Sequence, residues 1–156
     1  LAAVLPKKFF ESFMVTYNLF LQNAENKVLP LAKETDTGVL VMMPLNQPME
    51  GQTGLASRER ALENIRRFLE QGALPKEQQY SDPTVMDFLT AGTTMTLPQA
   101  ALRFILDHEA VSSVLAGTAN PKHLEDNLTA SSLPSLSPEV HSRARALFGG
   151  IDAHVK

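Results

Sequence analysis

The sequence contains no cysteine, so disulfide bonds, thiolate metal ligands and a cysteine nucleophile are excluded. No apolar run approaches the roughly 20 residues that a membrane-spanning helix needs. The formal net charge is only −3, which gives no overall attraction to nucleic acid or to an anionic membrane surface, and we expect neither as a partner. No metal site is expected either, because the four histidines are scattered without zinc-motif spacing: His108, His123, His141 and His154.

What is present fits a globular domain: 156 residues, of which 44% are hydrophobic and 20% charged. No secretory signal is recognisable, because the apolar stretch 1–5 is short and is followed rather than preceded by lysines. The default expectation is therefore a cytoplasmic protein. Residues 1–5 are interpreted as the end of a helix that Pro6 stops, and a chain that opens within a helix suggests an internal start.

The clearest local pattern lies at residues 111–128, which read VSSVLAGTANPKHLEDNL. Its first part, 111–116, is a run of Val, Leu and small residues that predicts a strand buried on both faces. Gly117 ends this run, and Thr118 or Asn120 can cap the helix that follows. Such a junction presents free backbone N–H groups that suit an anion such as phosphate. Most such junctions bind nothing, so the spacing alone leaves open both a phosphate site and a purely structural turn.

Two further strands and several helices follow from composition and capping signals. Residues 13–17 and 39–43 are rich in β-branched and other apolar residues, as expected of strands. Helices are expected at 24–34 (capped by Asn23, with a kink or late start at Pro30), at 58–69 after Ser57, at 84–91, from Thr96 to about His108, and at 136–149. His108 is expected to cap its helix rather than to act in catalysis. The turn-rich segment 46–57 is either a lid over a ligand or a passive surface loop.

The alternation of helices and strands predicts parallel βαβ units with right-handed crossovers. A complete (β/α)8 barrel has eight strands and usually about 250 residues, whereas only three strands are predicted here. Three parallel strands cannot close, so both sheet edges and part of the core would stay open. The predicted fold class is therefore α/β, a partial (β/α)8 TIM barrel with three parallel strands and surrounding helices. Residues 1–156 would form one incomplete domain.

Three motifs, in the right order, resemble the aldo-keto reductase family. One resembles the pattern Gly-[Thr/Ala/Ser]-x-x-Pro-x-x-[Leu/Ile]-x-[Glu/Asp]-Asn after the last barrel strand, and six residues match it: Gly117, Thr118, Pro121, Leu124, Asp126 and Asn127. Residues 17–19 resemble the YN-L signature that ends the sixth strand, and 38–45 resemble the seventh strand with its Met-Lys-Pro-Leu variant. Residues 101–106, ALRFIL, are similar to a helix of the family. The resemblance covers nearly the whole chain and points to the last three strand–helix units of the barrel.

This resemblance implies the C-terminal segment of an NADP(H)-dependent reductase, in which hydride transfer from NADPH reduces a carbonyl. It also implies that the catalytic Tyr, Lys, Asp and His lie on the first four strands, which this chain lacks. Tyr17 and Tyr80 do not occupy the catalytic position, and Tyr17 is expected to be a packed ring. Because the protein must still supply the proton donor, no catalytic residue is assigned and the segment alone should give no turnover. The substrate is not indicated by any recognisable polar constellation.

The resemblance also implies a partial site for NADP, with NAD as the alternative. Asp126 and Asn127 match the pair that addresses adenine, and residues 43–45 would offer backbone groups near the pyrophosphate. The full set of assigned cofactor-binding residues is Met43, Pro44, Leu45, Gly117, Thr118, Lys122, His123, Asp126 and Asn127.

Several positions depart from the family pattern. In one well-studied branch a Lys and an Arg hold the 2′-phosphate, whereas this chain has Gly117 and His123, with Lys122 as a neighbouring substitute. Met14 and Met42 replace a Gln and an aromatic residue at the nicotinamide end. These departures leave the preference between NADP and NAD open.

Two alternatives to a reductase segment remain. The chain is either a non-catalytic, reductase-like interaction protein that binds a partner through open strand edges, or a small βα protein that dimerises into a pseudo-barrel. The expected protein partner is accordingly either the missing N-terminal part of the barrel or a second copy of the chain.

Overall fold

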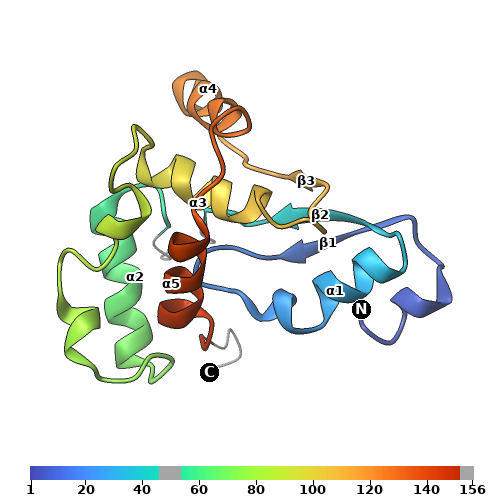
Figure 1. Ribbon diagram of the computed structural model, residues 1–156, viewed down its shortest axis with the longest axis horizontal. Coiled ribbons are helices and arrows are strands. Elements are labelled where there is room, and N and C mark those ends of the chain that lie inside the picture. Colours follow the sequence, from blue (N-terminus) through green and yellow to red (C-terminus); the bar gives the residue numbers. More distant parts are fainter. Residues whose placement is uncertain (46–53, 152–156) are drawn as a thin grey trace.

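The computed structural model describes residues 1–45 and 54–151, and its centre is a parallel three-stranded sheet (Figure 1). Strand β1 spans Ser12–Thr16, β2 spans Gly38–Met42 and β3 spans Ser113–Val114, in the spatial order β1-β2-β3. β2 pairs with all of β1 on one side, and on the other side Leu40 and Val41 pair with Ser113 and Val114. The predicted α/β class and the parallel arrangement are confirmed.

Five α-helices and four short 3-10 helices complete the described part of the chain. The α-helices are α1 Val28–Glu34, α2 Arg58–Glu70, α3 Leu97–Leu106, α4 Pro121–Ala130 and α5 Pro138–Phe148. The 3-10 helices are η1 Leu5–Lys7, η2 Asn23–Asn26, η3 Gln78–Ser81 and η4 Asp87–Leu89. The last four α-helices begin where a side chain accepts a hydrogen bond from a first-turn backbone N–H, which satisfies a group that the helix leaves unpaired: Ser57, Thr96, Asn120 and Ser137.

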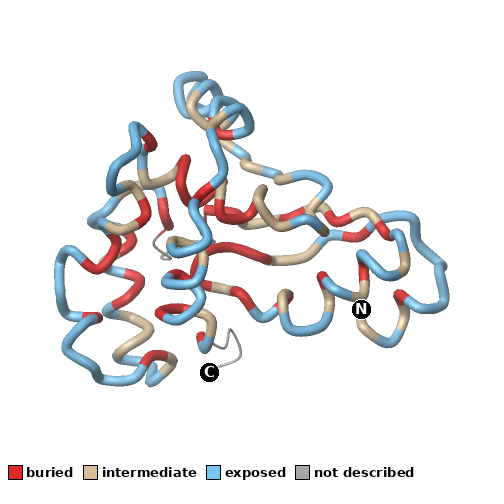
Figure 2. Tube along the Cα trace, viewed as in Figure 1, coloured by how far each residue is buried: buried red, intermediate tan, exposed pale blue. Residues whose placement is uncertain are grey.

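The two faces of the sheet differ in burial. Phe13, Val39 and Val41 are buried, and these side chains point to one face because strand residues alternate between faces. On the opposite face Met14 is 52% exposed. Leu115, which directly follows β3, is 44% exposed on the same face. The core joins this face of the sheet to the helices, and Figure 2 shows buried residues on both.

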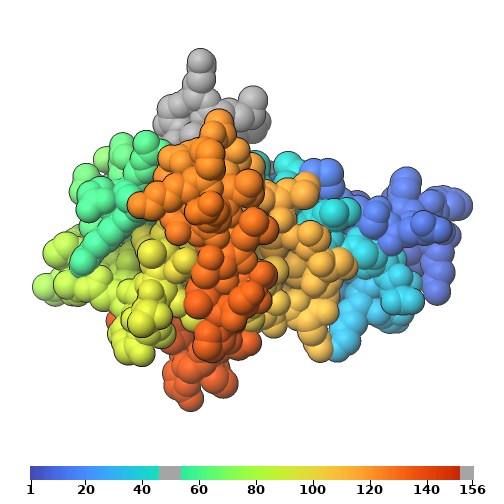
Figure 3. Space-filling model, turned by 90° about the horizontal axis from the view of Figure 1, so that it is seen from above, coloured from blue at the N-terminus to red at the C-terminus, as the bar shows by residue number. Residues whose placement is uncertain are grey.

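The last strand is shorter and more exposed than the prediction for 111–116. β3 pairs only with β2 and forms one edge of the sheet, and Ser113 is exposed. The predicted burial on both faces is wrong, because nothing in this three-stranded sheet covers the far side of the strand. α4, which follows it, packs mainly on α3 and lies at the surface facing the viewer in Figure 3.

Near the N-terminus, the structure differs from the predicted helices at two places, and each involves a proline. Pro6 does not stop a helix but lies in the first turn of η1, where its missing N–H is not needed. Asn23 begins η2 rather than capping a helix over 24–34, and α1 starts only at Val28. Pro30 is thereby the third residue of α1, again a position whose N–H has no partner within the helix, so the predicted late start is confirmed.

The prediction of an α-helix at 84–91 is wrong, because the structure has turns there and η4 is the helical segment within them. The Asp82 carboxylate accepts hydrogen bonds at 2.7 Å from both the N–H and the hydroxyl of Thr84. This local bonding stabilises a turn in competition with a helix. Within these turns Val85 and Leu89 are buried and Phe88 is half-buried. Most of the candidate lid, residues 46–53, lies outside the described residues, as does the C-terminal tail beyond Ile151.

Candidate functional site

The carboxyl ends of the three parallel strands meet at one edge of the sheet, where parallel α/β proteins commonly bind ligands. Asn18 follows β1, Met43 follows β2 and Gly117 follows β3. Val41 pairs with Val114, where β3 ends, and β2 continues for one more residue, to Met42. Segments 43–45 and 117–118 thus follow neighbouring strands at the same edge of the sheet.

After β2 the chain turns through an unusual conformation. Met43 has φ of 56°, in the left-handed region that few residues other than glycine adopt. Its carbonyl accepts a hydrogen bond of 3.0 Å from the Asn18 side-chain amide. Pro44 and Leu45 are buried, and the Leu45 carbonyl accepts a bond of 2.7 Å from the Leu55 N–H. Two of the three carbonyls in 43–45 are therefore already held within the chain.

Between β3 and α4, two side chains organise the turn. The Thr118 hydroxyl accepts a hydrogen bond of 3.1 Å from the Asn120 N–H, and the Asn120 side chain accepts one of 3.0 Å from the Lys122 N–H. Asn120, rather than Thr118, is the N-cap of α4. Because these two amides are engaged and Pro121 has none, the junction offers fewer free N–H groups than the bare sequence pattern indicates.

Gly117 is not required by the geometry of this chain. Its φ lies outside the left-handed region, and a Cβ added there would meet no atom within 4 Å. A side chain at this position would instead project into open space beside an exposed backbone. Neither backbone conformation nor packing within the described residues therefore accounts for a glycine here.

The remaining predicted residues lie on α4. Lys122 and His123 are exposed in its first turn, whereas Asp126 and Asn127 are half-buried one turn later. The Asp126 carbonyl accepts a weak hydrogen bond, 3.4 Å long, from the Gln99 side chain on α3. The structure thus brings Gly117, Thr118, Lys122 and His123 to the N-terminal end of one helix.

A charged cluster that sequence reasoning missed surrounds Tyr17. Tyr17 is fully buried, as predicted, and its hydroxyl donates to the Glu25 carboxylate. Arg145 on α5 donates to the same carboxylate through Nε at 2.7 Å and Nη2 at 3.1 Å. Burial raises the pKa of Tyr17, and the neighbouring Glu25 raises it further, so this hydroxyl is poorly suited to lose a proton. Glu25 and Arg145 are 120 positions apart in the sequence, and no local spacing indicates that they pair.

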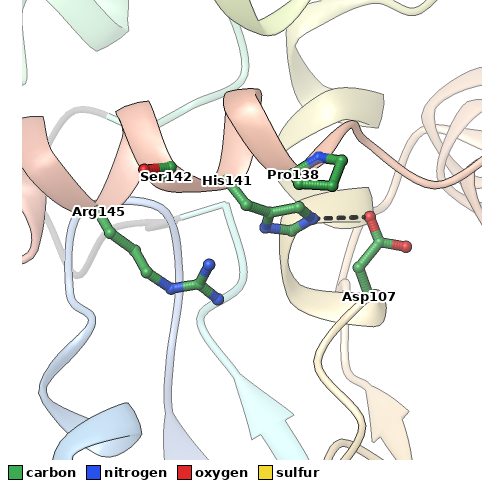
Figure 4. A pocket seen from close by; sticks show the side chains of 5 residues that line it. All are labelled: Asp107, Pro138, His141, Ser142 and Arg145. Atoms are coloured by element: carbon green, nitrogen blue, oxygen red, sulfur yellow. Dashed lines mark hydrogen bonds and ion pairs between the residues drawn. The ribbon is translucent and has the colours of Figure 1, made fainter.

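A second cluster lies beside it and lines an open pocket of about 460 Å³ (Figure 4). Asp107, just after α3, accepts hydrogen bonds from Arg103 and, at 2.9 Å, from the Leu136 N–H; the His141 ring lies 3.0 Å from the same carboxylate. Burial would raise the pKa of Asp107, but these bonds outweigh it and hold the pKa below its usual value. A carboxylate with so many donors ties three segments together and has little capacity left to accept a substrate proton.

His108 also has a structural position. Its Nδ1 accepts a hydrogen bond of 3.2 Å from the Ala110 N–H, and its ring meets the Tyr17 ring edge-on at 5.8 Å. Burial lowers the pKa of His108, which favours the neutral ring that this bond needs. The side chain therefore stabilises the turn after α3, close to the capping role expected from its position.

Two further properties concern the described residues as a whole. No three His, Asp or Glu side chains among residues 1–45 and 54–151 lie together in a way that would hold a metal ion. Over those same ranges, no helix has the length and apolarity to cross a membrane.

Comparison with known proteins points to one family. The model described as "Aldo/keto reductase family" matches residues 6–148, whereas no curated protein matches significantly. Among solved structures, the aldo-keto reductase AKR11C1 from Bacillus halodurans, in its holo form, is 22% identical with a TM-score of 0.61 and covers 99% of this chain. An aldo/keto reductase from Klebsiella pneumoniae, in complex with NADP and acetate, is 18% identical with a TM-score of 0.56 over 88% of this chain.

These likenesses establish the fold as part of a TIM barrel. The matches span 47% of the Bacillus halodurans chain and 39% of the Klebsiella pneumoniae chain, so this chain is less than half as long as the barrels it matches. Three parallel strands with their helices are what a portion of that size supplies.

Proposed function

This chain belongs to the aldo/keto reductase family, and from that premise we propose that it is the C-terminal segment of an NADP(H)-dependent carbonyl reductase. In this proposal residues 1–156 are one incomplete domain that contributes part of the cofactor site. The rest of a cytoplasmic polypeptide supplies the remaining strands and the catalytic Tyr, Lys, Asp and His. When bound, the cofactor supplies the hydride.

The observation that carries the proposal is the shared edge at which the neighbouring strands β2 and β3 end. That edge joins the turn at Met43 to the exposed junction at Gly117, and α4 begins there with Lys122 and His123. An exposed backbone without a side chain, near the Lys122 ammonium group and the His123 ring at a helix N-terminus, suits the phosphates of a dinucleotide. The NADP in the Klebsiella pneumoniae structure is consistent with this choice of ligand.

Each proposed site residue has a defined part. Residues 43–45 border the pyrophosphate, Gly117 and Thr118 line the approach, and Lys122 and His123 face the 2′-phosphate. Asp126 and Asn127 address adenine from the second turn of α4. The engaged carbonyls of Met43 and Leu45 fix the shape of this border rather than binding the phosphates themselves.

Binding tests the proposal directly. We expect the complete polypeptide that contains this chain to quench or shift NADPH fluorescence on titration. Lys122→Ala should weaken NADPH binding about tenfold while leaving NADH binding nearly unchanged, since only NADPH carries the 2′-phosphate. Lys76→Ala, which removes an exposed lysine near η3, is the matched control and should change neither affinity. Absence of NADPH binding up to millimolar concentration would contradict the proposal.

Turnover gives a second test. The 156-residue chain alone, mixed with NADPH and a broad panel of aldehydes and ketones, should not oxidise NADPH, because it lacks the proposed proton donor. The decrease in absorbance of NADPH measures this. Clear consumption by the purified chain would show that its own residues perform the chemistry.

The alternative function, a non-catalytic interaction protein, is favoured by one observation. Met14 and Leu115 on the uncovered sheet face, and Leu124 and Leu128 on α4, are all substantially exposed. If the complete polypeptide binds no dinucleotide yet forms a stable complex with a partner protein that buries these side chains, the function is protein interaction and not carbonyl reduction.

A further inference from the structure

The turn that ends β2 is held by a buried side chain from the neighbouring strand. Asn18 is fully buried, and its amide nitrogen donates to the Met43 carbonyl at 3.0 Å. Its amide oxygen accepts from the N–H groups of Phe20 at 3.0 Å and Leu21 at 2.9 Å. Both ends of the amide are therefore bonded, which fixes its orientation and leaves it no alternative rotamer without lost hydrogen bonds.

The residue that Asn18 holds is in a conformation that its own side chain disfavours. Met43 is left-handed, with φ of 56°. Pro44 disfavours the right-handed helical conformation at the residue before it, so the main competitor of the turn is continued extension of β2. Extension would move the Met43 carbonyl and the chain after it away from the sheet edge. The bond from Asn18 selects the turn over that competitor.

The other two non-glycine residues with positive φ in the described ranges show what is distinctive about Met43. Lys8 and Asp36 lie in exposed turns, and Asp is among the residues that tolerate this conformation best. Met43 is half-buried at the carboxyl end of the central strand, where the proposed dinucleotide site begins. Strained conformations that the surrounding structure enforces often mark binding sites.

We infer that Asn18 is a positioning residue for the dinucleotide: by holding the Met43 carbonyl it fixes the left-handed turn that places residues 43–45 against the cofactor. This inference rests on the proposed function. Asn18 does not touch the cofactor and acts through Met43.

The test measures NADPH affinity and thermal unfolding together in the complete polypeptide. Asn18→Asp keeps an acceptor for Phe20 and Leu21 but removes the donor to Met43. It should weaken NADPH binding about tenfold. Met43→Gly adopts the left-handed turn without strain, so adding it to Asn18→Asp should restore the affinity to within about threefold of Met43→Gly alone. Asp36→Gly is the matched control: it relieves a left-handed residue far from this edge and should rescue nothing.

Each outcome decides the question. If the parent polypeptide binds NADPH but Asn18→Asp lowers only the unfolding temperature and leaves the affinity unchanged, the inference is overturned while the proposed function stands. If the parent does not bind NADPH, the proposed function and the inference fail together.

Should Asn18→Asp not fold, Met43→Val provides the same test. A β-branched residue strongly disfavours the left-handed turn, so Met43→Val should bind NADPH about tenfold more weakly than Met43→Gly. Equal affinities for these two variants would overturn the inference.

Discussion

Glu25 links three parts of the molecule, because it accepts hydrogen bonds from Tyr17 after β1 and Arg145 on α5 while lying in η2. Burial alone would raise its pKa, but the bonds from Arg145 and Tyr17 outweigh burial and lower it. A carboxylate whose pKa is lower in the folded than in the unfolded chain adds stability at neutral pH, and this contribution disappears as the pH falls through the folded pKa.

We therefore expect the free energy of unfolding to decrease as the pH falls below about 4.5, the range where an unfolded glutamate becomes protonated. Asp107 contributes in the same direction, since its pKa is also lowered. Urea unfolding between pH 7 and pH 3 measures the slope, which should be shallower for Glu25→Gln. An unchanged slope in that variant would mean that Glu25 does not carry the effect.

The high pKa of Tyr17 gives a prediction at the other end of the pH scale. Because the folded chain keeps this hydroxyl protonated, its contribution to stability is complete below pH 10 and is lost as the pH rises further. Tyr17→Phe, which cannot ionise at this position, should lose less stability between pH 9 and pH 11 than the parent. Chemical denaturation at those two pH values tests the difference, and equal losses would contradict it.

For Asp107 we predict how much free energy of unfolding a substitution removes at neutral pH. Its side chain is 7% exposed and that of its partner Arg103 is 12% exposed, so Asp107→Asn leaves a buried guanidinium without its counter-charge. We expect a loss of about 2–4 kcal/mol in the free energy of unfolding. Asp87→Asn removes the partner of Arg58 from an exposed pair, 2.8 Å long, and should cost less than about 1 kcal/mol. Similar losses for the two variants would show that burial does not decide the outcome.

At the scale of single elements, α3 is the helix whose N-terminus carries a full capping box. Thr96 accepts from the Gln99 N–H while the Gln99 side chain accepts from the Thr96 N–H, and Pro98 lies in the first turn. Thr96→Ala should therefore destabilise the protein by about 1 kcal/mol. Thr94→Ala, two residues earlier and exposed, is the control and should be nearly neutral. Thermal unfolding of both variants compares them, and an equal effect would rule out the cap as the cause.

The elements that sequence predicts well are those whose signals are local. Ser57 and Thr96 mark the starts of α2 and α3 because a capping hydroxyl acts within three residues of itself. The segment 84–91 shows the limit of such signals, because composition and capping signals predict a helix there whereas Asp82 accepts from Thr84 in a turn. For β3, the composition of 111–116 indicated a strand correctly but could not show that no neighbour covers it.

In the candidate site, too, local features are predictable from the sequence and long-range contacts are not. The strand, glycine and capped helix around Gly117 follow from the sequence, and so does the identity of the residues on α4. The long-range contacts do not: at the edge Asn18 meets Met43 across 25 positions, and in the cluster around Tyr17 Glu25 meets Arg145 across 120. Pairings over such separations depend on the tertiary fold, which local patterns do not contain.

At the scale of the whole molecule, the uncovered apolar surface has a measurable consequence. Leu124 and Leu128, one turn apart on α4, are 48% and 64% exposed. Exposed apolar surface of this kind favours association. We expect the isolated chain to self-associate at micromolar concentration, and Leu124→Glu with Leu128→Glu to reduce the weight-average mass in sedimentation equilibrium. Ser142→Glu with Ala146→Glu adds the same charge at the same spacing on α5 and should have less effect; an equal effect would implicate net charge alone.

The position of β2 in the sheet determines where the backbone is best protected from solvent. Among the described strands it alone has neighbours on both sides, while β1 and β3 each turn one row of peptide groups outward. Amide protons exchange with deuterium most slowly when their hydrogen bonds open only on unfolding of the whole domain. Those of β2 should therefore be the last to exchange, and those facing outward on β1 and β3 should exchange early until a further strand pairs with them.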